Sequence, residues 1–253
     1  MSGQESERTA AERRESLKEV FLQARGCTRC PELAATRRTV VFGSGNADAD
    51  LMFIGEAPGA SEDEQGVPFV GRAGKLLEKL LEEIGQKRAE VFIANTLKCR
   101  PPGNRDPLPV EIENCQEYLL RQVELIEPTV ICTLVNFSTK LLRGDPTGIT
   151  RLHGQPEVRM LGARAVRLYP IYHPAAALYT PRMLQTLRED FARIPELLVL
   201  GPPEQPPAQE IPPLGEDAGV PAQTPAAPAD GAEPPPQAAL DAETREAEQL
   251  GLF

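Results

Sequence analysis

Long apolar runs are missing from this sequence of 253 residues, and none of its stretches is long enough to span a lipid bilayer. The N-terminus is polar and charged, which excludes a secretory signal peptide and favours a cytosolic protein. Only five cysteines are present, and cytosolic cysteines serve as metal ligands or inert thiols more often than as disulfides. No segment repeats itself, so a repeat architecture is not expected.

Aromatic and basic side chains are scarce from residue 201 onward. This stretch holds 12 of the 26 prolines, 10 acidic residues and one basic residue, Arg245. Because such a composition cannot bury enough apolar surface to fold alone, we expect 201–244 to be a disordered acidic linker rich in Pro and Ala. The chain totals are 27 basic and 37 acidic side chains, so residues 1–200 keep 26 and 27. The acidic charge therefore belongs to the tail, and a nucleic-acid partner stays open for the single domain expected at 1–200.

Short apolar runs alternate with amphipathic segments along the body of the chain. The pattern predicts strands at 50–54, 91–95, 129–134 and 165–171, and helices at 9–24, 72–85, 109–126, 136–143 and 181–198. This alternation predicts an α/β fold with a parallel sheet flanked by helices. Because parallel strands end at one shared edge, the polar segments 55–74, 95–107 and 173–181 should converge there.

Glycine and proline punctuate residues 55–74, which read GEAPGASEDEQGVPFVGRAG. The composition predicts a shaped loop and not a helix or strand interior. The loop is not a triphosphate-binding loop, because Phe69 stands where a glycine is needed and Leu76 where Ser or Thr is needed. A turn that only joins a strand to a helix is the plain alternative. The acids and the aromatic ring serve no purpose in such a turn, so we favour a ligand cradle.

Four of the cysteines are possible metal ligands: Cys27, Cys30, Cys99 and Cys115. The first two form a CxxC pair, the third lies on a proline-rich loop and the fourth lies on the helix that follows. Four thiolates suit zinc or an iron–sulfur cluster, and the spacing does not separate the two. Four unrelated buried thiols are the alternative. The fifth cysteine, Cys132, lies in an apolar run and is expected to pack in a buried strand.

Asn95 and His173 stand at the ends of two predicted strands. An asparagine amide offers one acceptor and two donors in one plane, which suits reading the edge of a base but also suits capping a loop. Pro174 biases His173 away from helix and toward a strand end that faces a loop, where a surface or capping role is the alternative. His153 has a weaker context, and we expect a structural role for it.

Together these segments resemble the family 4 uracil-DNA glycosylases, the iron–sulfur-containing branch of the uracil-DNA glycosylase superfamily. The resemblance runs from about residue 20 to residue 198. It rests on GEAPGASEDEQGVPFVGRAG, NTLKCRPPGNRDP, the HPA loop at 173–175 and the four cysteines in order. The resemblance implies a three-layer α/β/α sandwich around a short central parallel sheet. It also implies removal of uracil from single- or double-stranded DNA, which leaves an abasic site and initiates base excision repair.

The resemblance assigns roles to the pocket residues. The target nucleotide flips out of the DNA, Phe69 stacks on uracil, and Asn95 binds the polar edge of the base. Glu56, with the Gly55–Ala57 backbone, holds the base and the attacking water, and His173 donates a hydrogen bond to the uracil carbonyl. Glu62 and Asn104 are further pocket candidates. The catalytic pair implied is Glu56 and His173.

Two positions depart from the best-known branch of the superfamily. That branch has a water-orienting aspartate where this chain has Ala57, so we expect the glycosidic bond to break first and Glu56 to position the water. That branch also has a thymine-blocking tyrosine where this chain has Gly59, so thymine must be excluded by other means, either by Glu62 or by the depth of the pocket. No lysine is placed as a Schiff-base nucleophile, so strand cleavage is not expected.

The resemblance also implies the metal and the DNA contacts. Cys27, Cys30, Cys99 and Cys115 match the ligands of a 4Fe–4S cluster, for which we expect a structural role. Leu178 fills the gap left by the flipped base, with ordinary core packing as the alternative. Phosphates are expected to bind basic side chains, namely Lys98, Arg100, Arg105, Arg182 and Arg188. A catalytically silent DNA-binding protein and a redox sensor of the same fold are the competing functions. Intact Glu56, Asn95 and His173 argue against the first, and the lack of a flavin or reductase motif argues against the second.

The tail ends in an apolar cluster, Gln249, Leu250, Leu252 and Phe253. QLGLF resembles the QLxLF motif through which bacterial DNA-metabolism proteins bind the replication sliding clamp. A chance hydrophobic end is the alternative. Because the motif stands at the end of a long linker, we favour a clamp-binding peptide at 245–253. The protein is otherwise expected to be a monomer.

Overall fold

The structure, a computed structural model, describes residues 9–207. A six-stranded sheet with the order β1-β3-β2-β4-β6-β5 forms its centre. The strands are β1 (Ser44–Gly45), β2 (Leu51–Gly55), β3 (Phe92–Asn95), β4 (Val130–Thr133), β5 (Glu157–Leu161) and β6 (Arg164–Pro170). The four inner strands pair in parallel, whereas β1 and β5 pair antiparallel at the two edges. The expected parallel sheet is therefore the middle of a mixed one.

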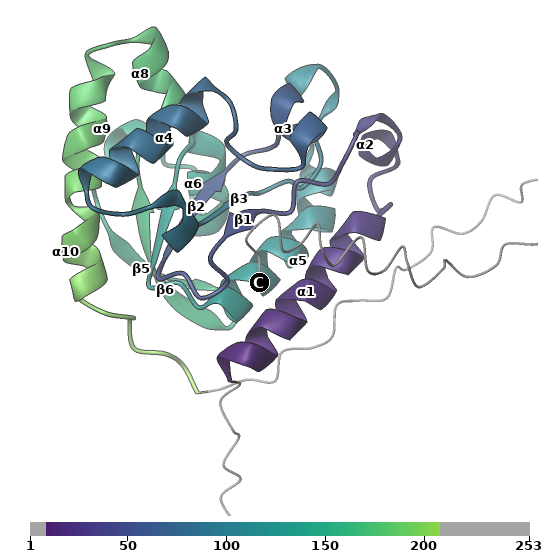
Figure 1. The fold of residues 1–253 in the computed structure, drawn as a ribbon, viewed down its shortest axis with the longest axis horizontal. Coiled ribbons are helices and arrows are strands. Elements are labelled where there is room, and N and C mark those ends of the chain that lie inside the picture. Colours follow the sequence, from purple (N-terminus) through teal and green to yellow (C-terminus); the bar gives the residue numbers. More distant parts are fainter. Residues whose placement is uncertain (1–8, 208–253) are drawn as a thin grey trace, which may run out of the picture.

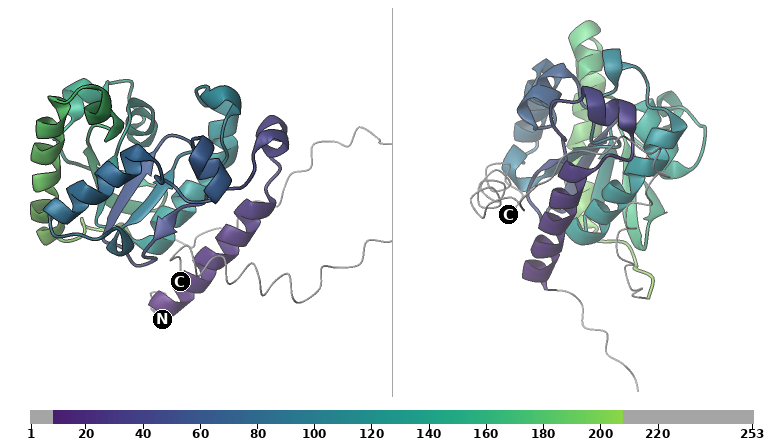
Figure 2. Two further views of the ribbon diagram at one scale, coloured as in Figure 1. Left: turned by 45° about the horizontal axis from the view of Figure 1, so that its top comes forward. Right: turned by 90° about the vertical axis from the view of Figure 1, so that its right-hand side faces the viewer.

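Helices cover both faces of this sheet (Figure 1). They are α1 (Ala10–Gly26), α2 (Pro31–Thr36), α3 (Ala60–Gln65), α4 (Arg72–Glu83), α5 (Pro109–Ile126), α6 (Asn136–Arg143), α7 (Ile149–Leu152), α8 (Ala175–Tyr179), α9 (Met183–Ala192) and α10 (Ile194–Val199), with short 3₁₀ turns at Arg88–Glu90 and Pro102–Asn104. The green helices α8, α9 and α10 lie on the side of the molecule away from the purple helix α1 (Figures 1 and 2). The three-layer α/β/α arrangement expected from the sequence is confirmed.

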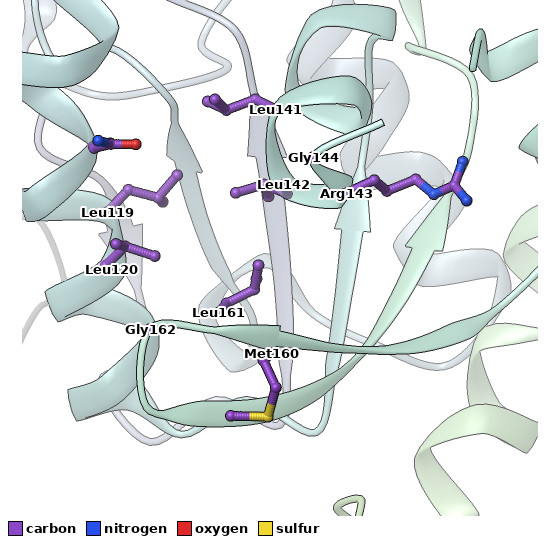
Figure 3. A pocket seen from close by; sticks show the side chains of 10 residues that line it. Leu119, Leu120, Leu141, Leu142, Arg143, Gly144, Met160, Leu161 and Gly162 are labelled. Atoms are coloured by element: carbon purple, nitrogen blue, oxygen red, sulfur yellow. The ribbon is translucent and has the colours of Figure 1, made fainter. Parts of the chain in front are cut away.

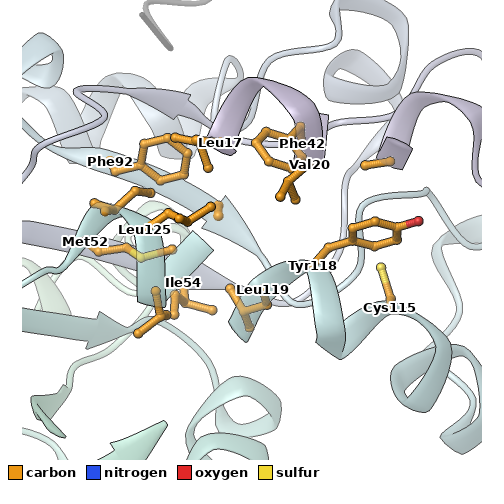
Figure 4. Packing of buried hydrophobic residues seen from close by; sticks show 14 of the residues in the cluster. Leu17, Val20, Phe42, Met52, Ile54, Phe92, Cys115, Tyr118, Leu119 and Leu125 are labelled. Atoms are coloured by element: carbon orange, nitrogen blue, oxygen red, sulfur yellow. The ribbon is translucent and has the colours of Figure 1, made fainter. Parts of the chain in front are cut away.

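Two apolar clusters, one on each face of the sheet, form the core. Along β2, Met52 and Ile54 belong to the cluster under α1 and α5, whereas Leu51 and Phe53 belong to the cluster under α4, α9 and α10. This alternation follows from the two-residue period of a strand, and burial on both faces explains why β2 is apolar throughout. Figure 4 shows the first cluster, which includes Leu17, Phe42 and Phe92, with Cys115 and Tyr118 at one end. Cys132 is fully buried in the second cluster, as expected.

The sequence placed most elements correctly and missed the irregular ones. The ranges predicted for α5 and α6 match the observed bounds. The helix predicted at 181–198 is two helices, α9 and α10, with a proline in the first turn of α10. The loop at 55–74 contains a short helix, α3, which the prediction of a loop without helix excluded. Glu62 explains α3, because a glutamate at the third helical position caps the start of a helix.

The first residues of the expected linker also differ from the prediction. The side chain of Gln205 pairs with the backbone of Ala165 in β6, accepting from its N–H at 3.1 Å and donating to its carbonyl at 2.9 Å. Arg167 donates to the carbonyl of Gly201 at 3.3 Å. Gly201 and Gln205 are therefore attached to the domain. The rest of the expected linker and the clamp-binding peptide at 245–253 lie outside the described residues.

Candidate active site

The carboxyl ends of β2 and β3 form the base of the site. Gly55 ends β2 and Asn95 ends β3, and the two residues are partners in the parallel register. A Cβ atom on Gly55 would stand 2.3 Å from Asn95 Oδ1 and 3.1 Å from the ring of Phe69. Only glycine leaves room for this amide and this ring to meet. The structure thus brings together three of the predicted pocket residues.

Phe69 occupies a strained backbone position above this base. Its φ is +55°, in the left-handed region where a bulky residue costs about 1–2 kcal/mol, and its side chain is only 5% exposed. Its N–H donates to Glu62 Oε1 at 2.6 Å. A Cβ on Gly74 would stand 1.6 Å from the carbonyl oxygen of Phe69, so the first turn of α4 also packs on this residue. Strain of this kind persists where the surroundings hold a residue in place, as they do here.

Glu62 has a different place from the one expected. The sequence suggested a pocket residue, but both carboxylate oxygens bind the loop backbone. Oε2 accepts from the N–H of Gly59 at 2.7 Å, and Oε1 accepts from Phe69. Glu62 therefore braces the two ends of the α3 segment and fixes the backbone of Phe69. The signal for this brace was in the sequence, because a glutamate three residues after a helix start is a capping pattern.

His173 faces Phe69 from the loop after β6. The two ring centroids lie 5.3 Å apart with 32° between the ring planes. The N–H of Ala175 donates to Nδ1 of His173 at 3.0 Å, so the ring proton of a neutral imidazole stands on Nε2. Burial lowers the pKa of His173 to about 4, which keeps the ring neutral at pH 7. His173 is thus a neutral donor through Nε2.

Asn95 offers the site an unused hydrogen-bond donor. The residue is 2% exposed, and its Nδ2 has no hydrogen-bond partner among residues 9–207. A buried donor without a partner costs about 1–3 kcal/mol. A ligand carrying a carbonyl group at this place would remove that cost. The alternative role of Asn95 as a loop cap does not explain the unpaired amide.

Glu56 is the titratable side chain that directly follows Gly55. It is half-buried, and burial, followed by the charge of Asp106, raises the pKa of its carboxyl group. Its carbonyl accepts from the N–H of Leu97 at 2.9 Å, which ties the loop after β2 to the loop after β3. Ala57 packs against the core cluster under α1 and α5 and brings no acid or base to its position.

The four predicted metal ligands gather at the other end of the loop after β3. Cys99 and Cys115 are buried and Cys27 and Cys30 pack against the same apolar cluster. We call these four residues the cysteine site. Their thiols are close enough to act on one another electrostatically. Within the described ranges, no three ligating side chains converge on a single ion position.

The surroundings of the cysteine site fit a thiolate-bound metal cluster. Three N–H groups point at its sulfur atoms: Arg37 Nη1 lies 3.2 Å from Cys99, the Lys98 backbone 3.3 Å from Cys115, and Asn114 3.6 Å from Cys30. Such donors stabilise charge on sulfur. Burial raises the pKa of the Cys115 thiol to about 12, and it also raises the pKa values of Cys99 and Cys30. Burial thus keeps the thiols of Cys99 and Cys115 neutral on their own, and a bound metal would deprotonate them.

The basic residues proposed for phosphate contact do not share one environment. Lys98 is 1% exposed and cannot contact a phosphate, which corrects the prediction. Arg105 is paired with Glu111 and Glu32, and Arg188 with Glu83. Arg100 donates to Oδ1 of the exposed Asn104 at 2.7 Å. This amide therefore stabilises a turn and does not line the pocket. Arg182 is exposed at the start of α9.

Three other features lie outside this site. A hollow of about 280 Å³ lies between α5, α6 and β5, and half of the residues that line it are leucines (Figure 3). None of the predicted functional residues lines it. In α8, Leu178 is half-buried, whereas its neighbour Tyr179 is 86% exposed. His153 lies 3.4 Å from Asp190 and against Tyr172, in keeping with a structural role.

The comparison with known proteins agrees with this geometry. The family model of the uracil DNA glycosylase superfamily matches residues 42–196, which include the ends of β2, β3 and β6. The type-4 uracil-DNA glycosylase of Archaeoglobus fulgidus is 45% identical over 188 residues, covering 72% of this chain and 94% of that protein. The type-4 enzyme of Thermotoga maritima is 44% identical over 167 residues, covering 65% and 85%. The chain belongs to the type-4 uracil-DNA glycosylases. No helix among residues 9–207 has the length and apolar character needed to cross a membrane.

Proposed function

We propose that this chain hydrolyses the N-glycosidic bond of deoxyuridine in DNA, releasing uracil and leaving an abasic site for base excision repair. The observation that carries the proposal is the meeting of Phe69, Asn95 and His173, where an aromatic face, an unpaired amide donor and a neutral imidazole donor surround one place. These are the groups that a planar base with carbonyl and N–H edges would bind. The family membership supports the same activity.

The reaction divides between the residues as follows. A uracil flipped out of the DNA stacks on Phe69, and the amide of Asn95 binds its polar edge. As the glycosidic bond breaks, negative charge grows on the leaving base, and His173 Nε2–H donates to the uracil carbonyl. A preorganised donor of this kind contributes roughly 3–4 kcal/mol to lowering the barrier.

No strong base stands beside the glycosidic bond to activate the attacking water. Ala57 brings no carboxylate, so the bond breaks first and leaves an oxocarbenium-like sugar. Glu56 positions the water that traps this sugar, and DNA phosphates stabilise the positive charge. Burial raises the pKa of this half-buried carboxyl group, and orienting a water requires only that the group accept a hydrogen bond.

The cysteine site holds a 4Fe–4S cluster in this proposal. The support is the set of four thiols with their N–H donors and the family membership. Glycosidic hydrolysis transfers no electrons, so the bound cluster serves as a crosslink with no part in the chemistry. It ties the ends of α1 and α2 to the loop after β3 and to α5. DNA phosphates then bind the more accessible cations, Arg100 and Arg182, and the exposed end of α8 enters the gap in the duplex.

The direct test uses oligonucleotides carrying U·G, U·A, single-stranded U and T·G, treated with the purified protein and then with alkali, which cleaves abasic sites. Uracil substrates should be cleaved only after the alkali step. The absence of cleavage of every uracil substrate would contradict the proposal, and cleavage before alkali would contradict a purely hydrolytic reaction.

The C-terminal QLGLF supports a second proposal, that the enzyme binds the replication sliding clamp and works as a clamp-tethered monomer in the cytosol. Deletion of residues 249–253 should abolish clamp binding in a pull-down and leave oligonucleotide excision unchanged. Substitution of the neighbouring Glu248 by Gln is the matched control. Undiminished clamp binding after the deletion would contradict this second proposal.

A further inference from the structure

Lys98 lies between the cysteine site and the pocket. The sequence suggests a phosphate contact for it, but its side chain points inward and is 1% exposed. Its ammonium donates to the backbone carbonyl of Asn95 at 2.9 Å and to Oε1 of Gln122 at 2.5 Å. It also lies over the ring of Phe42, 5.8 Å from the ring centroid. A fully buried lysine is rare and costly, so its place requires an account.

The partners of this ammonium are themselves fixed. Gln122 is fully buried on α5, and its Nε2 donates to the carbonyl of Phe42 at 2.9 Å. No carboxylate of residues 9–207 pairs with Lys98. The position of its ammonium is therefore set by Gln122 on α5 and by the carbonyl of Asn95.

Both ends of Lys98 act on functional groups. Its backbone N–H donates to Cys115 Sγ at 3.3 Å, and its side-chain ammonium donates to the carbonyl of Asn95, three residues earlier in the chain. Directly after Asn95, the N–H of Thr96 donates to the carbonyl of Gly55, and the N–H of Leu97 donates to the carbonyl of Glu56. The ammonium of Lys98 adds a third hydrogen bond to this turn, to the carbonyl of Asn95. One residue thus contacts both a predicted metal ligand and the residue that carries the unpaired amide.

We propose that Lys98 is a positioning residue that fixes Asn95 from the cysteine site, so that the cysteine site sets the geometry of uracil recognition. The proposal rests on the proposed role of Asn95 in reading uracil. It gives the cysteine site a role in catalytic geometry beyond stabilising the fold. Lys98 touches neither substrate nor water, and its effect reaches the reaction through Asn95.

The experiment compares full-length Lys98→Met with the wild type for iron content, visible absorbance of the cluster and excision of uracil from a single-stranded oligonucleotide. Methionine keeps the buried length and removes the donor. We expect full iron content, a KM within about twofold because phosphates dominate DNA affinity, and a kcat lowered about 10- to 100-fold, the range for groups that orient a functional ligand. Arg37→Met is the matched control, since Arg37 contacts Cys99 but not Asn95. Its activity should fall only in proportion to its iron.

A double substitution separates the possible outcomes. In an Asn95→Ala background, Lys98→Met should lower kcat no further, because Lys98 affects the reaction only through the Asn95 side chain, which this background lacks. An equal loss in both backgrounds, or a loss that follows iron content, would overturn the proposal while leaving the role of Asn95 intact. If Asn95→Ala alone kept the wild-type rate, the role of Asn95 and this proposal would both be overturned.

A second variant serves if Lys98→Met does not fold. Gln122→Leu removes one partner of the ammonium and leaves the loop after β3 unaltered. It should lower kcat in the same way and by a smaller factor, with KM and iron content unchanged. A wild-type kcat in a folded, iron-loaded Gln122→Leu protein would contradict the proposal.

Discussion

The pocket and the cysteine site both follow β3, yet they are held by different means. Hydrogen bonds and steric limits of the chain hold the pocket: Glu62 binds the Phe69 backbone, Ala175 fixes the His173 ring, and Gly55 admits the Asn95 amide. The cysteine site has buried thiols whose raised pKa values keep them neutral. The direct contacts of the pocket are therefore made by the chain itself, whereas the buried thiols of Cys99 and Cys115 would become thiolates on binding a metal.

The largest effect is expected from a substitution that disrupts the pocket and leaves the cysteine site intact. Gly55→Ala should lower uracil excision by at least about 100-fold, because its Cβ would stand 2.3 Å from Asn95 Oδ1 and displace the amide. Iron content should stay at the wild-type level. Single-turnover excision and iron analysis check both statements. Gly71→Ala is the control, since nothing lies within 4 Å of a Cβ at that position and its φ is negative. Similar rates for the two alanine variants would contradict the account.

The converse substitution breaks the cysteine site. Cys99→Ser should lose iron and lower the free energy of unfolding by about 4 kcal/mol or more, as the loss of a structural metal does. Denaturant unfolding with iron analysis measures this. Cys132→Ala removes a buried thiol from the opposite face of the sheet and should keep its iron. Full activity and unchanged DNA affinity in Cys99→Ser protein would contradict a structural role for the cluster.

The third prediction concerns the effect of low pH on stability, which depends on His173 in the pocket. The pKa of His173 is lowered from its ordinary 6.5 to about 4, so the unfolded chain binds a proton between these values that the folded protein does not. Lowering the pH through this window therefore favours unfolding, by at most about 3 kcal/mol once the pH is below 4. In His173→Gln protein this contribution is absent. Between pH 7 and pH 4 the free energy of unfolding should fall more steeply for the wild type than for the variant, and parallel curves would contradict the lowered pKa of His173.

The smallest expected effect concerns the brace under Phe69. Glu62→Gln keeps one acceptor and replaces the other with an amide N–H, so one of the two backbone donors at Gly59 and Phe69 loses its partner. The free energy of unfolding should fall by about 1–3 kcal/mol. Excision should slow several-fold, with iron content unchanged. Glu64→Gln, on the exposed side of α3, is the control and should stay within about 0.5 kcal/mol. Equal stability of the two variants would argue against the brace.

The sequence predicted the regular parts of the fold because their signals are local. The range of α5 was correct since a proline opens it and a left-handed residue, Glu127, follows it. The edge strands escaped notice because β1 has two residues and β5 alternates exposed and half-buried side chains with charges. The pattern of parallel strands predicted that the segments after these strands converge at one edge of the sheet. Which residues meet there, namely Gly55, Asn95 and His173, depends on strand order and was predictable only through the motifs.

Lys98 and Glu62 differ from the roles predicted for them, because charged residues in a functional loop suggest contact with a ligand. In the structure the ammonium of Lys98 faces Asn95 and Gln122, and the carboxylate of Glu62 binds two backbone N–H groups. The burial of Lys98 cannot be read from one sequence, because it depends on α5 packing over the loop after β3. The capping role of Glu62 could have been read from its position at the start of α3.

The central claim is that a pocket made by Phe69, Asn95 and His173 releases uracil from DNA. Its most direct test measures free uracil released from a duplex with one U·G pair under single-turnover conditions, for the wild type and for His173→Ala. The account predicts one uracil per duplex from the wild type, and a rate about 100- to 1000-fold lower in the variant with unchanged DNA affinity. No uracil from the wild type, or equal rates from the two proteins, would contradict it.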